Sequence, residues 1–371
     1  MAAEGRILIV TGETSGDRAA ARVVTALRAL RPGWRVEAVG GPELRAAGAE
    51  ILAPSDELSV MGFAEVVGRL PALRRRLGQL GGRLDEHRYD LFLPVDAPAF
   101  NLRLAKRARR AGVPVLYFIA PQVWAWGQGR VRDLRRLLSG LAVILPFEEA
   151  WFGREGVACR FVGHPIMEEA PPWGPPQAAL RLGLLPGSRL QEVRRHLPLM
   201  LAAAARLQAS WPGLACELLE SPALAPALYD DLLAGARPAP RRRREPSATF
   251  LADQRAVLVA SGTATLEAAV AGVPMAVLYR TGRLNYWLAR RLVRLQRIAL
   301  VNLVAGREVV PEFVQGAVQP ERVAEALATI LPDGPAREKQ RDAFLELRRA
   351  LGTPGCGERV ARMAIEILEG P

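Results

Sequence analysis

The sequence is poor in cysteine and in histidine, with three residues of each among 371 positions. The cysteines are odd in number and irregularly spaced, which argues against a disulfide scaffold and favours a reducing compartment. The histidines have no metal-ligand spacing with one another or with the cysteines, so we expect no metal site. The six residues concerned are Cys159, Cys216, Cys356, His87, His164 and His196.

Lysine is almost absent, although the chain carries a net charge of +12. Only Lys106 and Lys339 are lysines, so arginine supplies nearly all of the positive charge. A strongly basic protein can attract nucleic acid or an anionic membrane surface. Here the arginines accompany abundant alanine, leucine, glycine and proline, which is typical of GC-rich coding. The charge alone therefore does not predict a nucleic-acid partner.

A long hydrophobic run is also missing. No segment approaches the roughly 20 apolar residues that cross a bilayer. A strand expected at residues 6–11 leaves no room for a signal peptide before it. We therefore expect a protein that is soluble or that binds at a membrane surface.

What the sequence does contain is an alternation of short apolar runs with helical patterns, which predicts parallel sheets covered by helices. The expected strands are residues 7–10, 36–39, 91–95, 113–119, 141–145, 179–185, 215–219, 257–260 and 275–278. The proline-rich segment 171–176 can continue neither a helix nor a central strand, so it marks a linker. Residues 241–244, four arginines beside proline, are expected to form a solvated loop.

These features predict an α/β protein of two Rossmann-like, doubly wound domains that face a cleft. We expect an N-terminal domain at 1–169, a linker at 170–178 and a second domain at 179–335. Two helices should occupy 336–371, separated by the glycine-rich stretch 352–357, and pack back toward the N-terminal domain. In such folds, ligands bind at the carboxyl ends of the strands.

Two loops in the second half have the composition of phosphate sites. Leu185-Pro186-Gly187-Ser188-Arg189 joins an expected strand to a helix, whose N-terminal N–H groups and nearby arginine would attract an anion. Ser261-Gly262-Thr263 occupies the equivalent place after a later strand. Glu267, one turn further on, either accepts ribose hydroxyls or completes a capping box with Thr263. Together the loops predict a bound diphosphate and its ribose.

Two segments of the first half also follow expected strands. The loop Gly12-Glu13-Thr14-Ser15-Gly16-Asp17 lacks both the P-loop ending and the dinucleotide glycine spacing. It is either a ligand loop or a turn in which Ser15 or Asp17 caps the next helix. Asp96 is either a general base facing the cleft or a helix cap next to Pro98.

Aromatic and amphipathic segments raise similar alternatives. Trp124 and Trp126 either stack on a sugar, line an acyl groove or pack under a loop. His164 either binds a phosphate or serves as a structural residue. Residues 286–300 form a basic amphipathic pattern that fits either an anionic membrane surface or an ordinary surface helix. Residues 61–77 form another apolar helical surface.

Nine segments, in order along almost the whole chain, resemble the lipid-A-disaccharide synthase family, glycosyltransferases of the two-Rossmann-domain (GT-B) type. They are residues 12–17, 61–66, 95–101, 121–126, 145–148, 163–165, 185–189, 261–267 and 302–308. The resemblance implies transfer of a 2,3-diacylglucosamine unit from its UDP derivative to the 6-hydroxyl of 2,3-diacylglucosamine 1-phosphate. The anomeric configuration inverts, and neither a metal nor another cofactor takes part, which agrees with the missing Asp-x-Asp motif.

The resemblance also implies residue roles. Asp96 would be the catalytic base. The acceptor would be bound by Glu13, Ser15, Met61, Phe63, Gln122 and Trp124. The nucleotide sugar would be bound by Ser188, Arg189, Ser261, Gly262, Thr263, Glu267, Asn302, Arg307 and Glu308. The protein would act in the cytoplasm, bound peripherally to the inner face of the cytoplasmic membrane. Nucleic acid would not be a partner. The protein could be a monomer or a homodimer.

Two departures and two alternatives remain. Residues 237–250 do not resemble the family's usual strand, and Val301 replaces a common proline. A UDP-N-acetylglucosamine 2-epimerase of the same architecture would act on a water-soluble nucleotide sugar without acyl chains. A basic protein that only binds membranes or nucleic acid would not need Asp96, Arg189 and Glu267 together.

Overall fold

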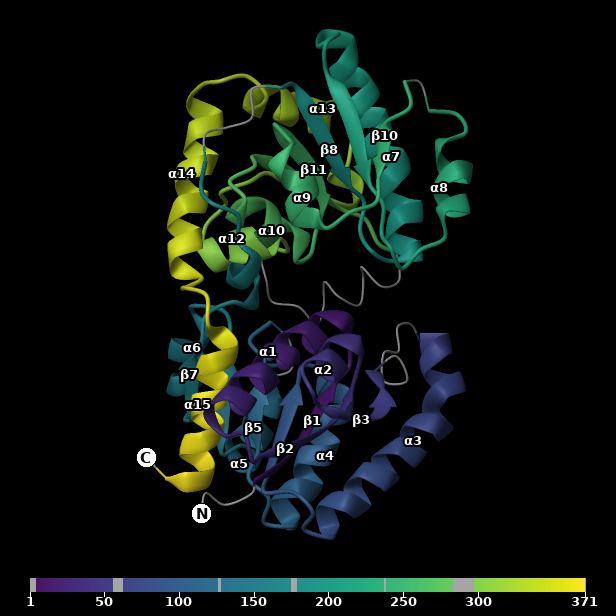
Figure 1. Cartoon of the computed structure of the whole chain (residues 1–371). Helices are drawn as coiled ribbons and strands as arrows, with labels where there is room; N and C mark the ends of the chain where they lie inside the picture. Colours follow the sequence, from purple (N-terminus) through teal and green to yellow (C-terminus); the bar gives the residue numbers. More distant parts are fainter. Residues whose placement is uncertain are drawn as a thin grey trace. The chain divides into compact units, whose positions relative to one another are not determined.

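The chain folds into two compact units in the computed structural model (Figure 1). The structure describes residues 5–55, 63–125, 128–174, 179–236, 238–282 and 297–370, with the backbone alone at 63–70 and 128. Unit 1 consists of Met1–Glu168 and Leu351–Pro371, and unit 2 of Glu169–Ala350. The chain thus passes from unit 1 to unit 2 and returns for its last helix.

Unit 1 contains a parallel sheet that, in the described part of the chain, has seven strands in the order β3-β2-β1-β4-β5-β6-β7. The strands are β1 (Arg6–Thr11), β2 (Arg35–Gly40), β3 (Glu50–Pro54), β4 (Leu91–Val95), β5 (Leu116–Phe118), β6 (Gly140–Val143) and β7 (Cys159–Phe161). The helices are α1 (Thr14–Leu30), α2 (Pro42–Ala46), α3 (Phe63–Asp85), α4 (Pro98–Arg110), α5 (Val131–Leu137), α6 (Glu148–Arg154) and α15 (Cys356–Glu369). The order reverses direction between β1 and β4, which is the switch point where doubly wound sheets bind ligands.

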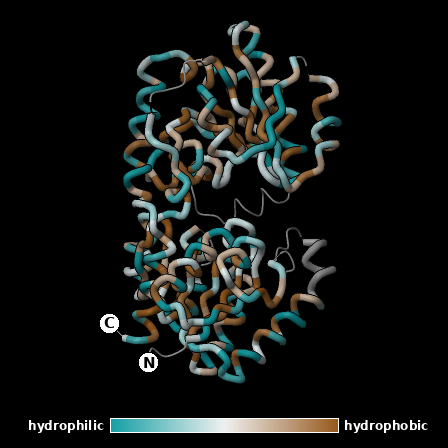
Figure 2. Tube along the Cα trace, in the orientation of Figure 1, coloured by the Kyte–Doolittle hydropathy of each residue, from teal (hydrophilic) through white to brown (hydrophobic). Residues whose placement is uncertain are grey.

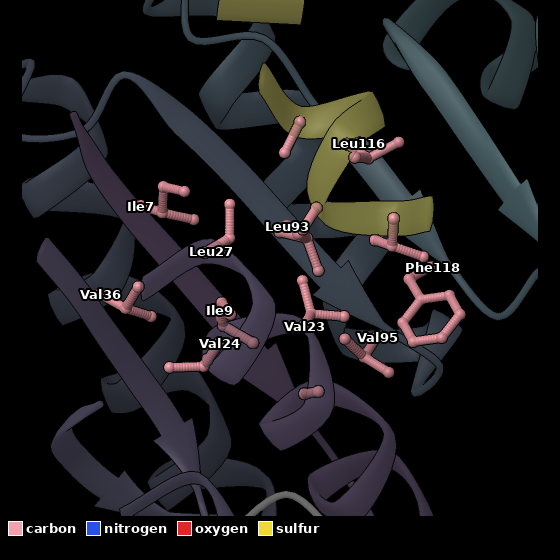
Figure 3. Packing of buried hydrophobic residues seen from close by; sticks show 14 of the residues in the cluster. Ile7, Ile9, Val23, Val24, Leu27, Val36, Leu93, Val95, Leu116 and Phe118 are labelled. Atoms are coloured by element: carbon pink, nitrogen blue, oxygen red, sulfur yellow. The ribbon is translucent and has the colours of Figure 1, made fainter. Parts of the chain in front are cut away.

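Strand β1 shows why both faces of this sheet are buried. Successive side chains of a strand point to opposite faces. Ile7 and Ile9 contribute to a core formed with α1 and α15, whereas Leu8 and Val10 contribute to a second core formed with α3 and α4. Figure 3 shows the first core, in which α1 lies across the strands. Continuous apolar strands are therefore what this layered arrangement requires.

Unit 2 contains a parallel sheet of six described strands in the order β10-β9-β8-β11-β12-β13. The strands are β8 (Arg181–Leu185), β9 (Ala215–Leu219), β10 (Arg241–Arg243), β11 (Ala256–Ala260), β12 (Met275–Tyr279) and β13 (Glu312–Val314). The helices are α7 (Leu190–Ser210), α8 (Pro226–Leu233), α9 (Ser247–Ala252), α10 (Ala264–Val270), α12 (Leu300–Ala305), α13 (Pro320–Ile330) and α14 (Pro335–Ala350). Its switch point lies between β8 and β11. Figure 2 shows hydrophobic and hydrophilic residues alternating along the helices, as expected where one face is buried.

The segment of arginines at 241–244 corrects the expectation of a solvated loop. Residues Arg241–Arg243 form the edge strand β10, which pairs in parallel with β9. Arg243 contacts Glu217 and Asp253 at 2.8 and 2.7 Å, and Arg242 bonds to Glu220. Acidic residues from other elements thus neutralise these arginines. From the sequence alone, such a run of like charges is expected to be exposed to solvent.

The two C-terminal helices pack on different units, whereas the sequence analysis predicted that both would pack toward the N-terminal domain. Helix α15 packs on α1 of unit 1, while α14 packs on α10 and α12 of unit 2. The linker residue Trp173 explains part of the attachment of α14, since Arg341 and Arg348 of that helix lie 5.1 and 6.0 Å from its ring centre. Glu168 in turn accepts hydrogen bonds from the N-terminal N–H groups of α15.

In the part of the chain that the structure describes, no helix is both long enough and apolar enough to cross a membrane.

Candidate functional site

The switch point of unit 1 brings together two loops that the sequence singled out. Thr11, the last residue of β1, pairs with Val95, the last residue of β4, so Gly12 and Asp96 both follow at the same edge. A Cβ at Gly12 would lie 2.5 Å from the Cβ of Ala97. Glycine is therefore required at position 12, because the two loops touch there.

Asp96 lies half-buried beside the charge of Glu13. Burial raises the pKa of the Asp96 carboxyl group above its ordinary value, and the neighbouring Glu13 raises it further. A hydrogen bond from the backbone of Ala97 opposes these effects in part. Asp96 thus combines exposure at a strand end with a carboxylate that is more basic than usual.

The helix-capping interpretations of this region are wrong. Helix α4 begins at Pro98 with Ala97 as its N-cap residue, so Asp96 lies one position too early to cap it. Helix α1 begins at Thr14 with Glu13 as its N-cap residue, and Ser15 is exposed in the first turn.

Asp17 has a different partner from the one expected. Its carboxylate accepts hydrogen bonds from the backbone N–H groups of Gly41 and Glu43, at 2.6 and 3.1 Å. It therefore ties α1 to the start of α2, and leaves Glu13 and Ser15 at the edge of the sheet.

Trp124 packs under its loop. Its side chain is 9% exposed, and its indole Nε1 donates a hydrogen bond to Glu148 Oε1 at 3.0 Å. Phe147 meets the indole edge-on with the ring centres 5.0 Å apart. The structure favours the packing interpretation over a stacking surface for a sugar, whereas Gln122 next to it is exposed.

Glu148 is an acidic residue that sequence reasoning noted only as part of a motif. Besides Trp124, it accepts hydrogen bonds from the backbone N–H groups of Ile144 and Leu145. Burial raises its pKa to about 7. His164 is also structural, since its Nδ1 accepts a hydrogen bond from Ile166 N at 3.1 Å and burial lowers its pKa to about 4.

Several expected contact residues lie outside the described part of the chain. They are Met61, the side chains of Phe63, Val66 and Leu70, Trp126, and most of the basic segment at 286–300. The second half of the apolar surface at 61–77 is described, and it differs from the expectation. Leu73 and Leu77 on α3 pack against the core shared with α4 rather than forming a free apolar face.

The switch point of unit 2 brings together the two candidate phosphate loops. Strands β8 and β11 are direct neighbours, so the loop 186–189 and the loop 261–263 leave the same edge of the sheet side by side. Gly187 adopts a φ of +112°, and a Cβ there would lie 2.5 Å from Glu192 Oε2. Ser188 and Arg189 are exposed at the start of α7, with Arg189 Nη1 lying 3.2 Å from Glu192 Oε1.

His196 connects this loop with the next strand, and sequence reasoning missed it. It is 1% exposed, and its Nε2 accepts a hydrogen bond from Arg280 N at 3.1 Å. Its Nδ1 lies 2.9 Å from the Pro186 carbonyl oxygen, so the Nδ1–H tautomer satisfies both contacts. His196 lies about one and a half turns after the start of α7, and from there its side chain reaches back to the loop. This spacing from the loop is the signal by which the sequence could have indicated the contact.

The other residues expected to bind the nucleotide sugar differ in burial and in their contacts. Glu267 is half-buried at the fourth position of α10, and the capping-box position belongs to Leu266, so the capping interpretation of Glu267 is wrong. Arg307 and Glu308 are exposed, with Arg307 Nη2 lying 2.9 Å from Glu346. Ser261 Oγ donates to the Ile298 carbonyl oxygen at 3.0 Å.

Asn302 corrects an expectation, because its amide is fully used inside the protein. The side chain is 0% exposed. Its Nδ2 donates to Val310 O and to Glu312, and its Oδ1 accepts from the backbone N–H groups of Val309 and Val310. Asn302 therefore shapes the segment that carries Arg307 and Glu308 and does not present its amide to a ligand.

Within the described ranges, no group of three or more histidine, cysteine or acidic side chains is arranged to hold a metal ion.

Comparison with known proteins decides the family. A family model described as lipid-A-disaccharide synthetase matches residues 7–363. The lipid-A-disaccharide synthase of Anaeromyxobacter dehalogenans (strain 2CP-1 / ATCC BAA-258) is 43% identical over 373 residues, covering 98% of this chain and 97% of that protein. The chain belongs to the lipid-A-disaccharide synthase family. It is a glycosyltransferase of lipid A biosynthesis, as the resemblance implied.

Solved structures of low sequence identity show the fold alone. The glycotransferase of kitacinnamycin superposes with a TM-score of 0.67 at 19% identity, covering 98% of this chain and 99% of its own. The UDP-GlcNAc 2-epimerase of Methanocaldococcus jannaschii, solved with UDP-GlcNAc and UDP, superposes with a TM-score of 0.61 at 13% identity, covering 97% and 99%. These likenesses confirm the two-domain α/β fold, while the family assignment selects the synthase over the epimerase alternative.

Proposed function

We propose that this member of the lipid-A-disaccharide synthase family joins UDP-2,3-diacylglucosamine to the 6-hydroxyl of 2,3-diacylglucosamine 1-phosphate with inversion. The products are the β-1,6-linked disaccharide 1-phosphate and UDP. An inverting transfer is a single displacement, which requires a base for the acceptor proton and positive groups for the departing diphosphate. In this proposal, the switch point of unit 1 supplies the base and the switch point of unit 2 supplies the positive groups.

The observation that supports the proposal best is the environment of Asp96. It lies at the carboxyl end of β4, at the switch point, with its pKa raised by burial and by Glu13. In its ionised form, a carboxylate with a raised pKa is a better proton acceptor than an ordinary one. Asp96 would take the proton from the 6-hydroxyl as that oxygen attacks the anomeric carbon, while the bond to UDP breaks.

The loops of unit 2 support the donor half of the proposal. The N-terminal N–H groups of α7, together with Ser188 and Arg189, would hold the diphosphate. The neighbouring loop of Ser261, Gly262 and Thr263 would lie along it, and Glu267 would accept the ribose hydroxyls. Arg307 and Glu308 would complete the pocket, on the segment that Asn302 fixes.

The acceptor half is proposed for the edge of unit 1. Glu13 and Ser15 follow β1 at the same edge as Asp96, and Gln122 is exposed after β5. Met61 and Phe63 would receive acyl chains. Trp124 would stabilise the loop that carries Gln122, since its indole N–H donates a hydrogen bond to Glu148.

The direct test is incubation of the purified protein with both acylated substrates, with UDP release and disaccharide formation followed together. We expect equal amounts of the two products, none when either lipid is omitted, and a β linkage in the proton coupling of the anomeric hydrogen. Conversion of UDP-N-acetylglucosamine to its 2-epimer without an acceptor would instead support the epimerase, and an α linkage would refute inversion.

A further inference from the structure

The junction between β4 and α4 has an unusual backbone. Asp96 and Ala97 are consecutive residues with φ values of +49° and +46°, in the left-handed region. That region is unfavourable for residues with a Cβ, and it persists only where surrounding contacts impose it.

Two fully buried side chains bind the backbone carbonyl oxygen of Asp96. Asn101 Nδ2 donates to it at 2.8 Å, and the hydroxyl of Tyr117 donates to it as well. Both side chains are 0% exposed. The N–H group of Asp96 donates to Phe118 O at 3.1 Å, so the peptide groups on both sides of its Cα are fixed.

Asn101 also bridges the two strands of the switch point near their carboxyl ends. Its Nδ2 lies 3.2 Å from Val10 O and 3.3 Å from Val95 O, near the ends of β1 and β4. Among the described residues, its buried Oδ1 has no hydrogen-bond donor. A buried amide that leaves its acceptor unused is unfavourable for stability, so a residue selected for packing alone would not need to be asparagine.

We propose that Asn101 and Tyr117 are positioning residues, which hold the carbonyl group of Asp96 inward so that its carboxylate points out from the sheet edge beside Glu13. The proposal rests on the proposed function of Asp96 as general base. Without these donors, the peptide can turn toward an ordinary conformation, and the carboxylate then moves away from the acceptor hydroxyl. Neither side chain takes part in the proton transfer itself.

Tyr117→Phe tests this role because it removes one hydroxyl group and keeps the buried ring. We expect kcat to fall about 10-fold, since small misplacements of a reacting group are costly, while the KM values for both substrates stay within about 2-fold of wild type. Tyr89→Phe is a matched control in the same unit. The Tyr89 hydroxyl donates to Glu37 at 2.6 Å and accepts from Arg83 at 2.8 Å, near the opposite end of β4. It should lower the urea midpoint comparably and leave kcat unchanged.

A double-mutant cycle separates positioning from stability. If Tyr117 acts through Asp96, Tyr117→Phe should cause almost no further loss of turnover in an Asp96→Asn background. Asn101→Ser should behave in the same way, and it provides a second variant if Tyr117→Phe is poorly folded. Independent, multiplicative losses in the cycle, or an unchanged kcat in both variants while Asp96→Asn is inactive, would overturn the positioning role. Full turnover by Asp96→Asn itself would instead refute the proposed base.

Discussion

Asp96 and Glu13 are two carboxyl groups that share one edge of the unit 1 sheet, and their repulsion has a consequence for pH dependence. Because the Asp96 pKa is raised, protonation should inactivate the base as pH falls through that raised value. Activity should therefore decline on the acid side of its pH profile, at a pH above the ordinary pKa of an aspartate.

Glu13→Gln should move that acid limb to lower pH. The substitution removes a negative charge that raises the Asp96 pKa, so Asp96 stays ionised in more acidic solution. We expect the acid limb of the kcat/KM profile to shift to lower pH. An unmoved limb, or one moved to higher pH, would show that Glu13 does not act on the titrating group.

His164 should make folding sensitive to acid. Its folded pKa is about 4 and its ordinary value is 6.5, so between these values the unfolded chain binds the extra proton and stability falls as pH falls. On this basis the contribution lost between pH 7.5 and pH 5 is about 2 kcal/mol. His164→Asn, which keeps an acceptor for Ile166 N, should lose less stability over that interval in urea unfolding.

Glu148 contributes a pH dependence of folding stability that is opposite in sign to that of His164. The effect of His164 is therefore measured as a difference between the variant and the wild type. Its folded pKa is raised to about 7, which means that the folded state binds the proton first and gains stability as pH falls from 7 toward 4.5. The difference between the His164→Asn and wild-type curves cancels this contribution. Identical pH slopes for the two proteins would contradict the account of His164.

At the scale of elements, the loops after β8 and β11 are the donor half of the proposed site. Arg189→Ala should weaken UDP binding by about 10-fold or more, because a hydrogen bond to a charged group contributes about 1.5–3 kcal/mol. Glu267→Ala should weaken UDP binding through the ribose.

Isothermal titration with UDP measures both effects, and Arg241→Ala provides the control. Arg241 carries the same charge on an exposed side chain at the start of β10, away from the carboxyl edge. Its variant should bind UDP as wild type does. Unchanged affinity in both Arg189→Ala and Glu267→Ala would place the nucleotide elsewhere.

Local pattern was enough to predict the central strands. The runs at 91–95 and 215–219 are apolar or flanked by clear breaks, and the structure has β4 and β9 with the same bounds. The short strands β3, β7 and β13 were not predicted, because three to five mixed residues carry little periodic signal. Strand β10 was missed for another reason, since its arginines are stabilised by acidic residues distant in sequence.

The candidate site was predictable as a set of loops but not as a set of contacts. Strand ends identified Asp96 and the loop at 186–189. The roles of Asn302 and Trp124 could not be read from sequence, because their partners Val310, Glu312 and Glu148 reach them only in the folded protein.

At the scale of the whole molecule, the acylated substrates that we propose and the net charge of +12 lead us to propose binding at an anionic membrane surface. Each basic residue near such a surface contributes about 1 kcal/mol, and salt screens the attraction. Sedimentation with vesicles should show binding that rises with anionic lipid and falls with added salt. Phe63→Glu should reduce activity on long-chain substrates more than on short-chain ones. Salt-insensitive binding, or equal loss on both substrates, would contradict this view.

In the proposed mechanism, this glycosyltransferase uses Asp96 at the β1–β4 switch point as its base. Turnover by Asp96→Asn tests it most directly, with UDP affinity and the urea midpoint measured on the same preparation. We expect turnover to fall by roughly 10²–10⁴-fold, while UDP affinity and folding stay close to wild type. Near-normal turnover by a variant that binds UDP and folds normally would contradict it.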